Sequence, residues 1–418
     1  MSAARPPEGA HTVAGGEGVP SFAARPPEGA HTAAGGEGIP SIAARPPEGA
    51  HTAAEGEGIP SIAARPPEGA RTVAEGEGTP VSASAMAFTP GPLVRAKDWL
   101  VRRPSAFTLL LIVALCAVVG GINPVFFQMS NLFDMARACV VVGLFALGVL
   151  IVLAAGGLDV SFTAIAALCM YAITKAVLRY APGTPIAVIL LAGAVGGALL
   201  GALNGLLVHA LQTPSLIVTI GTQYLYRGLL LTFVGTSLFM NIPASMEAFG
   251  TLALIDRVSA QGTRSVLPAF VLVLAAAAAL TWWLLNRTLM GRAVFAIGGS
   301  LSIAQRLGYR LRTVQVFVFA YAGLLAGVAG IVHVSSNRMA SPFDLHGMEL
   351  DVIAAVILGG ARITGGNGTV AGTLLGVVLV TLVNNVLILV GVPSTWQKVI
   401  VGSFIVLAGA FFAIRRSR

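Results

Sequence analysis

The sequence GRAVFAIGGSLSIAQRLGYRLRTVQ, residues 291–315, decides the fold, because it is a basic polar segment between two long apolar ones. It contains no acidic residue, and its four arginines are Arg292, Arg306, Arg310 and Arg312. Under the positive-inside rule, such a segment is a loop on the cytoplasmic side of a membrane. Within the loop, residues 302–307 favour a short helix that ends at Gly308, because glycine commonly terminates helices.

The composition places this loop in a polytopic membrane protein. Of 418 residues, 56% are hydrophobic and 11% are charged, and the mean hydropathy is +0.83. These values are far from those of a soluble domain. Residues 1–85 contain ten Glu and five Arg, whereas residues 86–418 contain eight acidic residues and twenty-one Lys or Arg. The net charge of +8 therefore belongs to the membrane part, where topology explains it without a nucleic-acid partner.

No enzyme active site or metal site is indicated. The three cysteines, Cys116, Cys139 and Cys169, lie inside apolar runs and suit small core residues better than a disulfide or metal framework. The histidines outside the N-terminal repeats are far apart, and no hydrolase motif or phosphate-binding loop occurs. We therefore expect no cofactor, and any ATP-driven step would require another chain.

Residues 2–80 are four copies of a 20-residue unit that is rich in Pro, Gly, Ala and Glu. The unit has almost no large apolar residue, so it cannot bury a core, and we expect residues 1–85 to be disordered. The near-identical copies suggest a recent tandem duplication of coding DNA. Translation starting at Met86 is an open alternative, in which case the repeats are not part of the protein.

Deleting residues 1–85 is expected to leave the activity of the membrane part unchanged, because the repeats have no apolar face that could pack on it. The measurement compares that activity in cells that produce the full or the shortened chain at equal levels. A large loss of activity would contradict this interpretation of the repeats.

Ten apolar runs follow a basic segment at 86–104, which we place in the cytoplasm. Most approach the ~20 residues needed to cross a bilayer. The run at 349–362 is shorter and contains two acids, so it is either a half-span or a span shielded by its neighbours. The runs are 105–122, 138–155, 160–178, 186–209, 215–234, 266–286, 313–334, 349–362, 368–391 and 396–414.

The predicted fold is an all-α polytopic membrane bundle of about ten transmembrane helices over residues 105–414. With ten spans, both termini are cytoplasmic, including the basic tail at 415–418. Gly, Ala and Ser crowd the spans, and small residues allow close helix packing in lipid. The longest outer loop, residues 235–265, is expected to contain a short surface helix.

Two glycine-rich breaks mark candidate sites within the bundle. Asp159 and Ser161 follow Gly156-Gly157 at the start of a new helix, the construction by which transporters line a pathway. A second break spans residues 359–368. Asparagines follow each break, and acids precede the second one; these candidates are Asn204, Asn384, Asn385, Glu349 and Asp351.

Each of these polar residues has an alternative interpretation. Asparagines inside membranes more often join helices than bind ligands. The acids, together with Arg227 inside a predicted span, could instead lie at span ends where water satisfies them.

Four ordered blocks resemble the permease subunit of ribose-type ATP-binding cassette sugar importers. The likeness runs from about Leu100 to Ala413. The blocks are AAGGLDVSFTAIAAL (154–168), LNGLLVHALQTPSLIVTIGTQYLYRGLLL (203–231), GRAVFAIGGSLSIAQRLG (291–308) and ELDVIAAVILGGARITGGNGTVAGTLLG (349–376). This resemblance implies a permease for a monosaccharide or similar small polyol in the bacterial inner membrane. It also implies a pore of two permease copies or close paralogues, a cytoplasmic ATPase that binds the ATP, and a periplasmic sugar-binding protein.

The resemblance also assigns residues 291–312 as the loop that couples to the ATPase. The residues it points to are Arg292, Ala304, Gln305, Arg306 and Gly308. Two positions depart from the family pattern. Ser302 replaces a frequent acid or Asn, and Phe162 stands in the first break where the family is commonly less bulky.

Three other functions stay open on the sequence alone. An ion-coupled secondary carrier would use Asp159, Glu349 or Asp351 as its titrating group. A branched-chain amino-acid permease of the same superfamily shares the overall pattern. A membrane enzyme acting on lipid-linked sugars is disfavoured by the scarcity of polar residues beside the loops.

Overall fold

The computed structural model describes residues 104–258 and 264–391, together with residues 393, 396, 399, 402, 403 and 406. The expectations for residues 1–103, for most of the tenth apolar run and for the basic C-terminal tail fall outside these residues.

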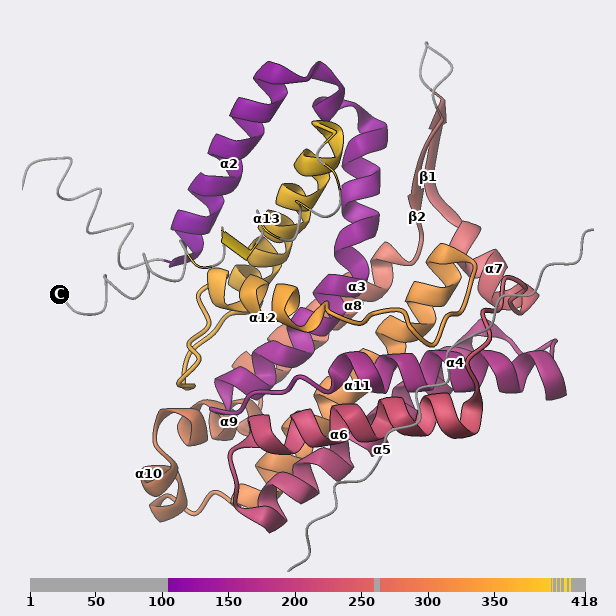
Figure 1. Cartoon of the computed structure of the whole chain (residues 1–418). Helices are drawn as coiled ribbons and strands as arrows, with labels where there is room; N and C mark the ends of the chain where they lie inside the picture. The colour runs from indigo at the N-terminus through magenta and orange to yellow at the C-terminus, as the bar shows by residue number, and fades with distance from the viewer. Residues whose placement is uncertain are drawn as a thin grey trace, which may run out of the picture. The chain divides into compact units, whose positions relative to one another are not determined.

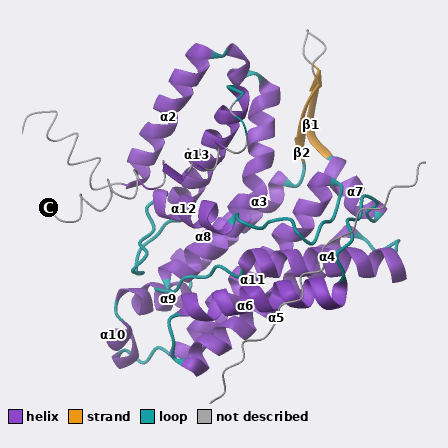
Figure 2. Cartoon of the chain, viewed as in Figure 1, coloured by secondary structure: helices purple, strands orange, loops and turns teal. Residues whose placement is uncertain are grey.

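Helices make up most of the described structure, and loops and one two-stranded hairpin make up the rest, as Figure 2 shows. In chain order, the helices before the hairpin are α2 (Pro104–Ile122), η1 (Pro124–Phe127), α3 (Met129–Ala154), α4 (Phe162–Tyr180), α5 (Ile186–Leu211), α6 (Ser215–Leu229), η2 (Leu230–Val234) and α7 (Ala244–Thr251). Those after it are α8 (Val271–Arg287), α9 (Leu289–Gly299), α10 (Leu301–Arg306), α11 (Leu311–Asn337), α12 (Glu349–Leu358) and α13 (Val370–Leu389).

Seven of the described helices are long and apolar enough to cross a membrane: α2, α3, α4, α5, the continuous α6–η2 segment, α11 and α13. An eighth span results if α8 and α9, which meet at a bend of 73°, are counted together. The first nine predicted runs each contain a helix. Helix α12 has ten residues, so the short run at 349–362 is a half-span rather than a full crossing. The all-α polytopic fold is confirmed.

Helices α5 and α11 pack through glycines spaced four residues apart. Gly193, Gly197 and Gly201 of α5 face Gly323 and Gly327 of α11. Since residues at i and i+4 share one helix face, the repeat removes side chains from a single stripe and brings two backbones together. Figure 1 shows α5 and α11 with α4 and α6 in one group, while α2, α3 and α13 form another.

The outer loop contains the expected short helix, α7, and also a hairpin that was not predicted from the sequence. Strand β1 (Ala253–Val258) pairs antiparallel with β2 (Arg264–Pro268). Arg264 donates two hydrogen bonds to the Asp256 carboxylate across the hairpin, at 3.1 and 2.6 Å. These hydrogen bonds lower the pKa of Asp256.

Candidate functional site

The first glycine break leads into a buried polar turn just before α4. Gly156 adopts φ +82°, a left-handed conformation that suits glycine, directly after α3 ends. Asp159 Oδ1 then accepts hydrogen bonds from the Ser161 backbone N–H at 2.8 Å and from the Ser161 hydroxyl at 2.7 Å. Both side chains are buried. The Asp159 carboxylate thus closes a turn onto Ser161, the N-cap residue of α4, whose own side chain makes no capping hydrogen bond to the helix.

A chain of hydrogen bonds connects the Asp159–Ser161 turn to α5 and α6. Asn204 donates from Nδ2 to the Ser161 hydroxyl at 2.7 Å, and the Tyr226 hydroxyl donates to Asn204 Oδ1 at 2.8 Å. Both side chains are buried, so each hydrogen bond compensates for lost hydration. The structure therefore brings together three of the predicted site residues: Asp159 and Ser161, which precede α4, and Asn204 of α5. Tyr226 was not predicted, although it lies in the second resembling block.

The start of α6 supports the broken backbone between α3 and α4. Ser215 Oγ accepts a hydrogen bond from the Leu158 N–H at 2.8 Å, and Thr219 Oγ1 accepts a longer one from the Val160 N–H at 3.4 Å. Backbone groups released by a helix break must find partners inside a membrane. Two hydroxyls of α6 supply them here.

A second polar cluster surrounds Glu349, the first residue of α12. Glu349 Oε1 accepts hydrogen bonds from Thr163 of α4 and from Gln223 of α6, the latter at 2.9 Å. Arg227 of α6 forms an ion pair with the same oxygen at 3.7 Å. Within the described residues, the Nε and Nη2 atoms of Arg227 are buried without a hydrogen-bond partner. The cluster therefore combines one shared acceptor, Glu349, with guanidinium donors that are not saturated by the described residues.

The remaining predicted pathway residues lie elsewhere. Asn385 donates to Asn131 Oδ1 at 3.0 Å, which joins α13 to the opposite end of α3 from Asp159. Asn384 precedes it on α13 and is half-buried, and Asp351 is half-buried in the first turn of α12. Phe162 packs inside the bundle against Phe145 of α3, with ring centroids 5.1 Å apart. The two asparagines of α13 are therefore not part of the Asp159 network.

A junction of glycines joins both breaks to the end of α9. The Gly366 N–H of the second break donates to the Ala154 carbonyl at the first, at 3.0 Å. Gly298, near the end of α9, packs against both Ala154 and Gly366. A Cβ added to Gly298 would lie 2.0 Å from the Ala154 oxygen and 2.6 Å from the Gly366 nitrogen. We call this contact of Gly156, Gly298, Gly365 and Gly366 the glycine junction.

The short helix α10 projects next to this junction, as Figure 1 shows. The Ser300 hydroxyl caps its start, and Gly308 follows its end with φ +84°, close to the predicted bounds. Ala304 is completely buried within the chain itself. Gln305, Arg306 and Gly308 are exposed, as is Arg292 on α9. The exposed face of α10 also carries Leu301, Ile303 and Leu307.

Replacing Asp159 with alanine is expected to impair folding or transport. The change removes the acceptor of two Ser161 donors, and leaving buried donors unpaired costs about 1–3 kcal/mol. Asp159→Asn keeps an oxygen at Oδ1 and should be milder. Thermal unfolding and solute uptake of both variants are the measurements. Wild-type uptake and expression in Asp159→Ala would remove this residue from the site.

A polytopic membrane bundle with two glycine breaks, buried polar clusters at one of them and an exposed short helix, α10, is the architecture of a membrane permease. Residues 131–409 match the sequence profile of a family described as the permease component of branched-chain amino acid transport systems. The chain belongs to this permease family.

Two curated relatives agree with this assignment. The ribose import permease protein RbsC of Escherichia coli is 30% identical over 75% of this chain and 94% of its own length. The autoinducer 2 import system permease protein LsrC of Yersinia pestis is 33% identical over 70% of this chain and 80% of its own length. No solved structure is significantly similar. The resemblance drawn from the four sequence blocks is thereby confirmed.

Proposed function

We propose that the chain is the membrane subunit of an ATP-binding cassette importer for a monosaccharide or similar small polyol. A ribose import permease that matches this chain over 94% of its own length supports the sugar over the branched-chain amino acid named for the family. The subunit works in the bacterial inner membrane with both termini in the cytoplasm. It pairs with a second copy or a close paralogue.

Energy comes from a separate cytoplasmic ATPase, which binds the ATP, and a periplasmic binding protein delivers the sugar. The observation that carries this proposal is the glycine junction, in which the end of α9, directly before α10, contacts both helix breaks. Movement of α10 by a partner would therefore reach the Asp159 and Glu349 clusters through backbone contacts that contain no compressible side chains.

The two clusters have distinct roles in this proposal. The Asp159–Ser161–Asn204–Tyr226 chain holds the broken backbone in place. The Glu349 cluster, in which two guanidinium nitrogens of Arg227 lack a hydrogen-bond partner among the described residues, offers transient hydrogen bonds to sugar hydroxyls. Weak contacts suffice there, because the binding protein supplies the affinity for the sugar.

The ATPase contact is made by the exposed face of α10, with Gln305 and Arg306, and by Arg292. Ala304 is buried against the rest of its own chain. Its small side chain therefore allows α10 to pack closely on this chain, and it does not contact the ATPase. An exposed apolar face next to arginines is typical of a protein interface.

Gly308→Trp is expected to reduce ATPase co-purification at least tenfold while membrane insertion stays intact. The side chain would extend into the open space beside α10 where the partner docks. Because φ is +84°, any side chain here also costs about 1–2 kcal/mol of backbone strain. Gly308→Ala carries the same strain without the bulk and is the control. If Gly308→Trp assembled normally, the docking assignment would be wrong.

The proposal as a whole is tested by co-purification of the detergent-solubilised chain produced together with its neighbouring genes. We expect a two-to-two assembly with an ATP-binding cassette protein, identified by mass spectrometry. A chain that purifies alone and transports on an ion gradient would instead support a secondary carrier.

A further inference from the structure

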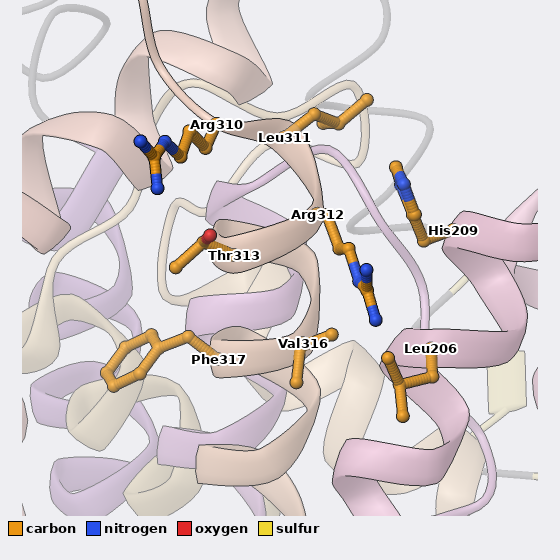
Figure 3. A pocket seen from close by; sticks show the side chains of 8 residues that line it. All are labelled: Leu206, His209, Arg310, Leu311, Arg312, Thr313, Val316 and Phe317. Atoms are coloured by element: carbon orange, nitrogen blue, oxygen red, sulfur yellow. The ribbon is translucent and has the colours of Figure 1, made fainter.

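A basic groove lies where α5 ends and α11 begins, separate from both polar clusters. It has a volume of about 780 Å³, and eight residues line it: Leu206, His209, Arg310, Leu311, Arg312, Thr313, Val316 and Phe317. Figure 3 shows Arg312 directed from α11 toward α5, where His209 and Leu206 form the other wall. Arg310 points to the opposite side of the groove.

Along the axes of α5 and α11, the groove is polar at the helix ends and apolar about one turn further into the helices. Arg310, Arg312 and Thr313 stand at the start of α11, whereas Val316 and Phe317 lie about one turn further along it. On α5, His209 lies near the helix end, and Leu206 lies about one turn deeper. Because α5 and α11 are both candidate membrane spans, the polar level faces the headgroup region and the apolar level faces the hydrocarbon.

The charge of the groove is uncompensated. No acidic side chain lines it, and within the described residues neither Arg310 nor Arg312 forms an ion pair. His209 is held at the wall by its contact from Nδ1 to Gln315 Oε1 at 3.1 Å. Two arginines and a threonine hydroxyl are suitable donors for a phosphate group, and arginine binds phosphate through two parallel hydrogen bonds.

We propose that this groove binds an anionic phospholipid. The headgroup phosphate binds Arg312 on the α5 side of the groove, and an acyl chain runs along Leu206 and Val316 beside it. Arg310 adds a second positive charge at the same level on the other side of α11. A basic pocket between membrane helices is the usual form of such a site. A soluble phosphate compound would use the arginines alone and would gain nothing from the apolar level beneath them.

The test uses the full-length purified chain and measures thermal unfolding and lipid retention by native mass spectrometry. The probes are phosphatidylglycerol, phosphatidylcholine and inorganic phosphate. We expect at least tenfold preferential retention of phosphatidylglycerol over phosphatidylcholine, with a higher unfolding temperature. The double variant Arg310→Gln, Arg312→Gln should lose this preference. Leu206→Asn, a change at an exposed position, should weaken it without changing the charge.

The matched control is the double variant Arg179→Gln, Arg287→Gln, which removes the same charge at two other exposed positions and should keep the preference. Three results would overturn the proposal. They are equal retention of both lipids by the wild type, an unchanged preference in the Arg310, Arg312 double variant, and equal stabilisation by inorganic phosphate. Loss of ATPase binding by that double variant, with lipid retention unaffected, would also overturn it and assign the groove to protein docking.

Discussion

Gly201→Ala is expected to prevent the bundle from assembling, although it adds only one methyl group. The added Cβ would lie 2.1 Å from the Phe319 carbonyl oxygen of α11. Backbone atoms cannot rotate away as a side chain can, so α5 and α11 would have to separate along their shared stripe. Overpacking typically costs about 1–3 kcal/mol, and we expect about 3 kcal/mol or more for this variant because several close contacts open together.

The measurement for Gly201→Ala is size-exclusion chromatography and thermal unfolding of the solubilised protein. Gly196→Ala is the matched control on the same helix, because its Cβ would meet only Cys169 Sγ, at an ordinary 3.5 Å. We expect the control to resemble the wild type and Gly201→Ala to aggregate. Equal unfolding temperatures for the two variants would contradict the packing described for α5 and α11.

Gly298→Ala is expected to reduce transport at least tenfold while leaving insertion and ATPase binding in place. Its Cβ would clash with the Ala154 oxygen and the Gly366 nitrogen, and so force the end of α9 away from both helix breaks. The clash lies where α9 and α3 end and not along a shared helix face, so the bundle should still form. The measurements are sugar uptake and ATPase activity in reconstituted vesicles, where hydrolysis should continue without matching uptake.

The neighbouring glycine provides the control for this prediction. Gly299 has open space where a Cβ would be added, so Gly299→Ala should transport like the wild type. If Gly298→Ala transported equally well, the glycine junction would not couple α10 to the breaks.

Features set by local sequence could be predicted. The apolar runs located the spans, and the basic loop with Gly308 located α10, because hydropathy and helix termination depend on neighbouring residues. The pairing of Asp159 with Ser161 could be anticipated for the same reason, since the turn that they form lies within a few residues of the glycine break.

Features set by packing between distant segments could not be predicted. Tyr226 and Gln223 look like ordinary residues of a span until α6 is placed against α4 and α12. Conversely, Asn385 resembles Asn204 in sequence but faces Asn131 at the other end of α3. The inward orientation of Ala304 depends on how α10 folds against its own chain. The hairpin was missed because the polar loop showed no clear apolar alternation.

The most direct test of the proposed transport function is sugar uptake by vesicles that contain the chain and its co-purified ATPase, with the binding protein added outside. We expect uptake of a monosaccharide that requires ATP on the ATPase side and persists when ion gradients are abolished. Uptake that proceeds without ATP and stops with the proton gradient would contradict the proposed function.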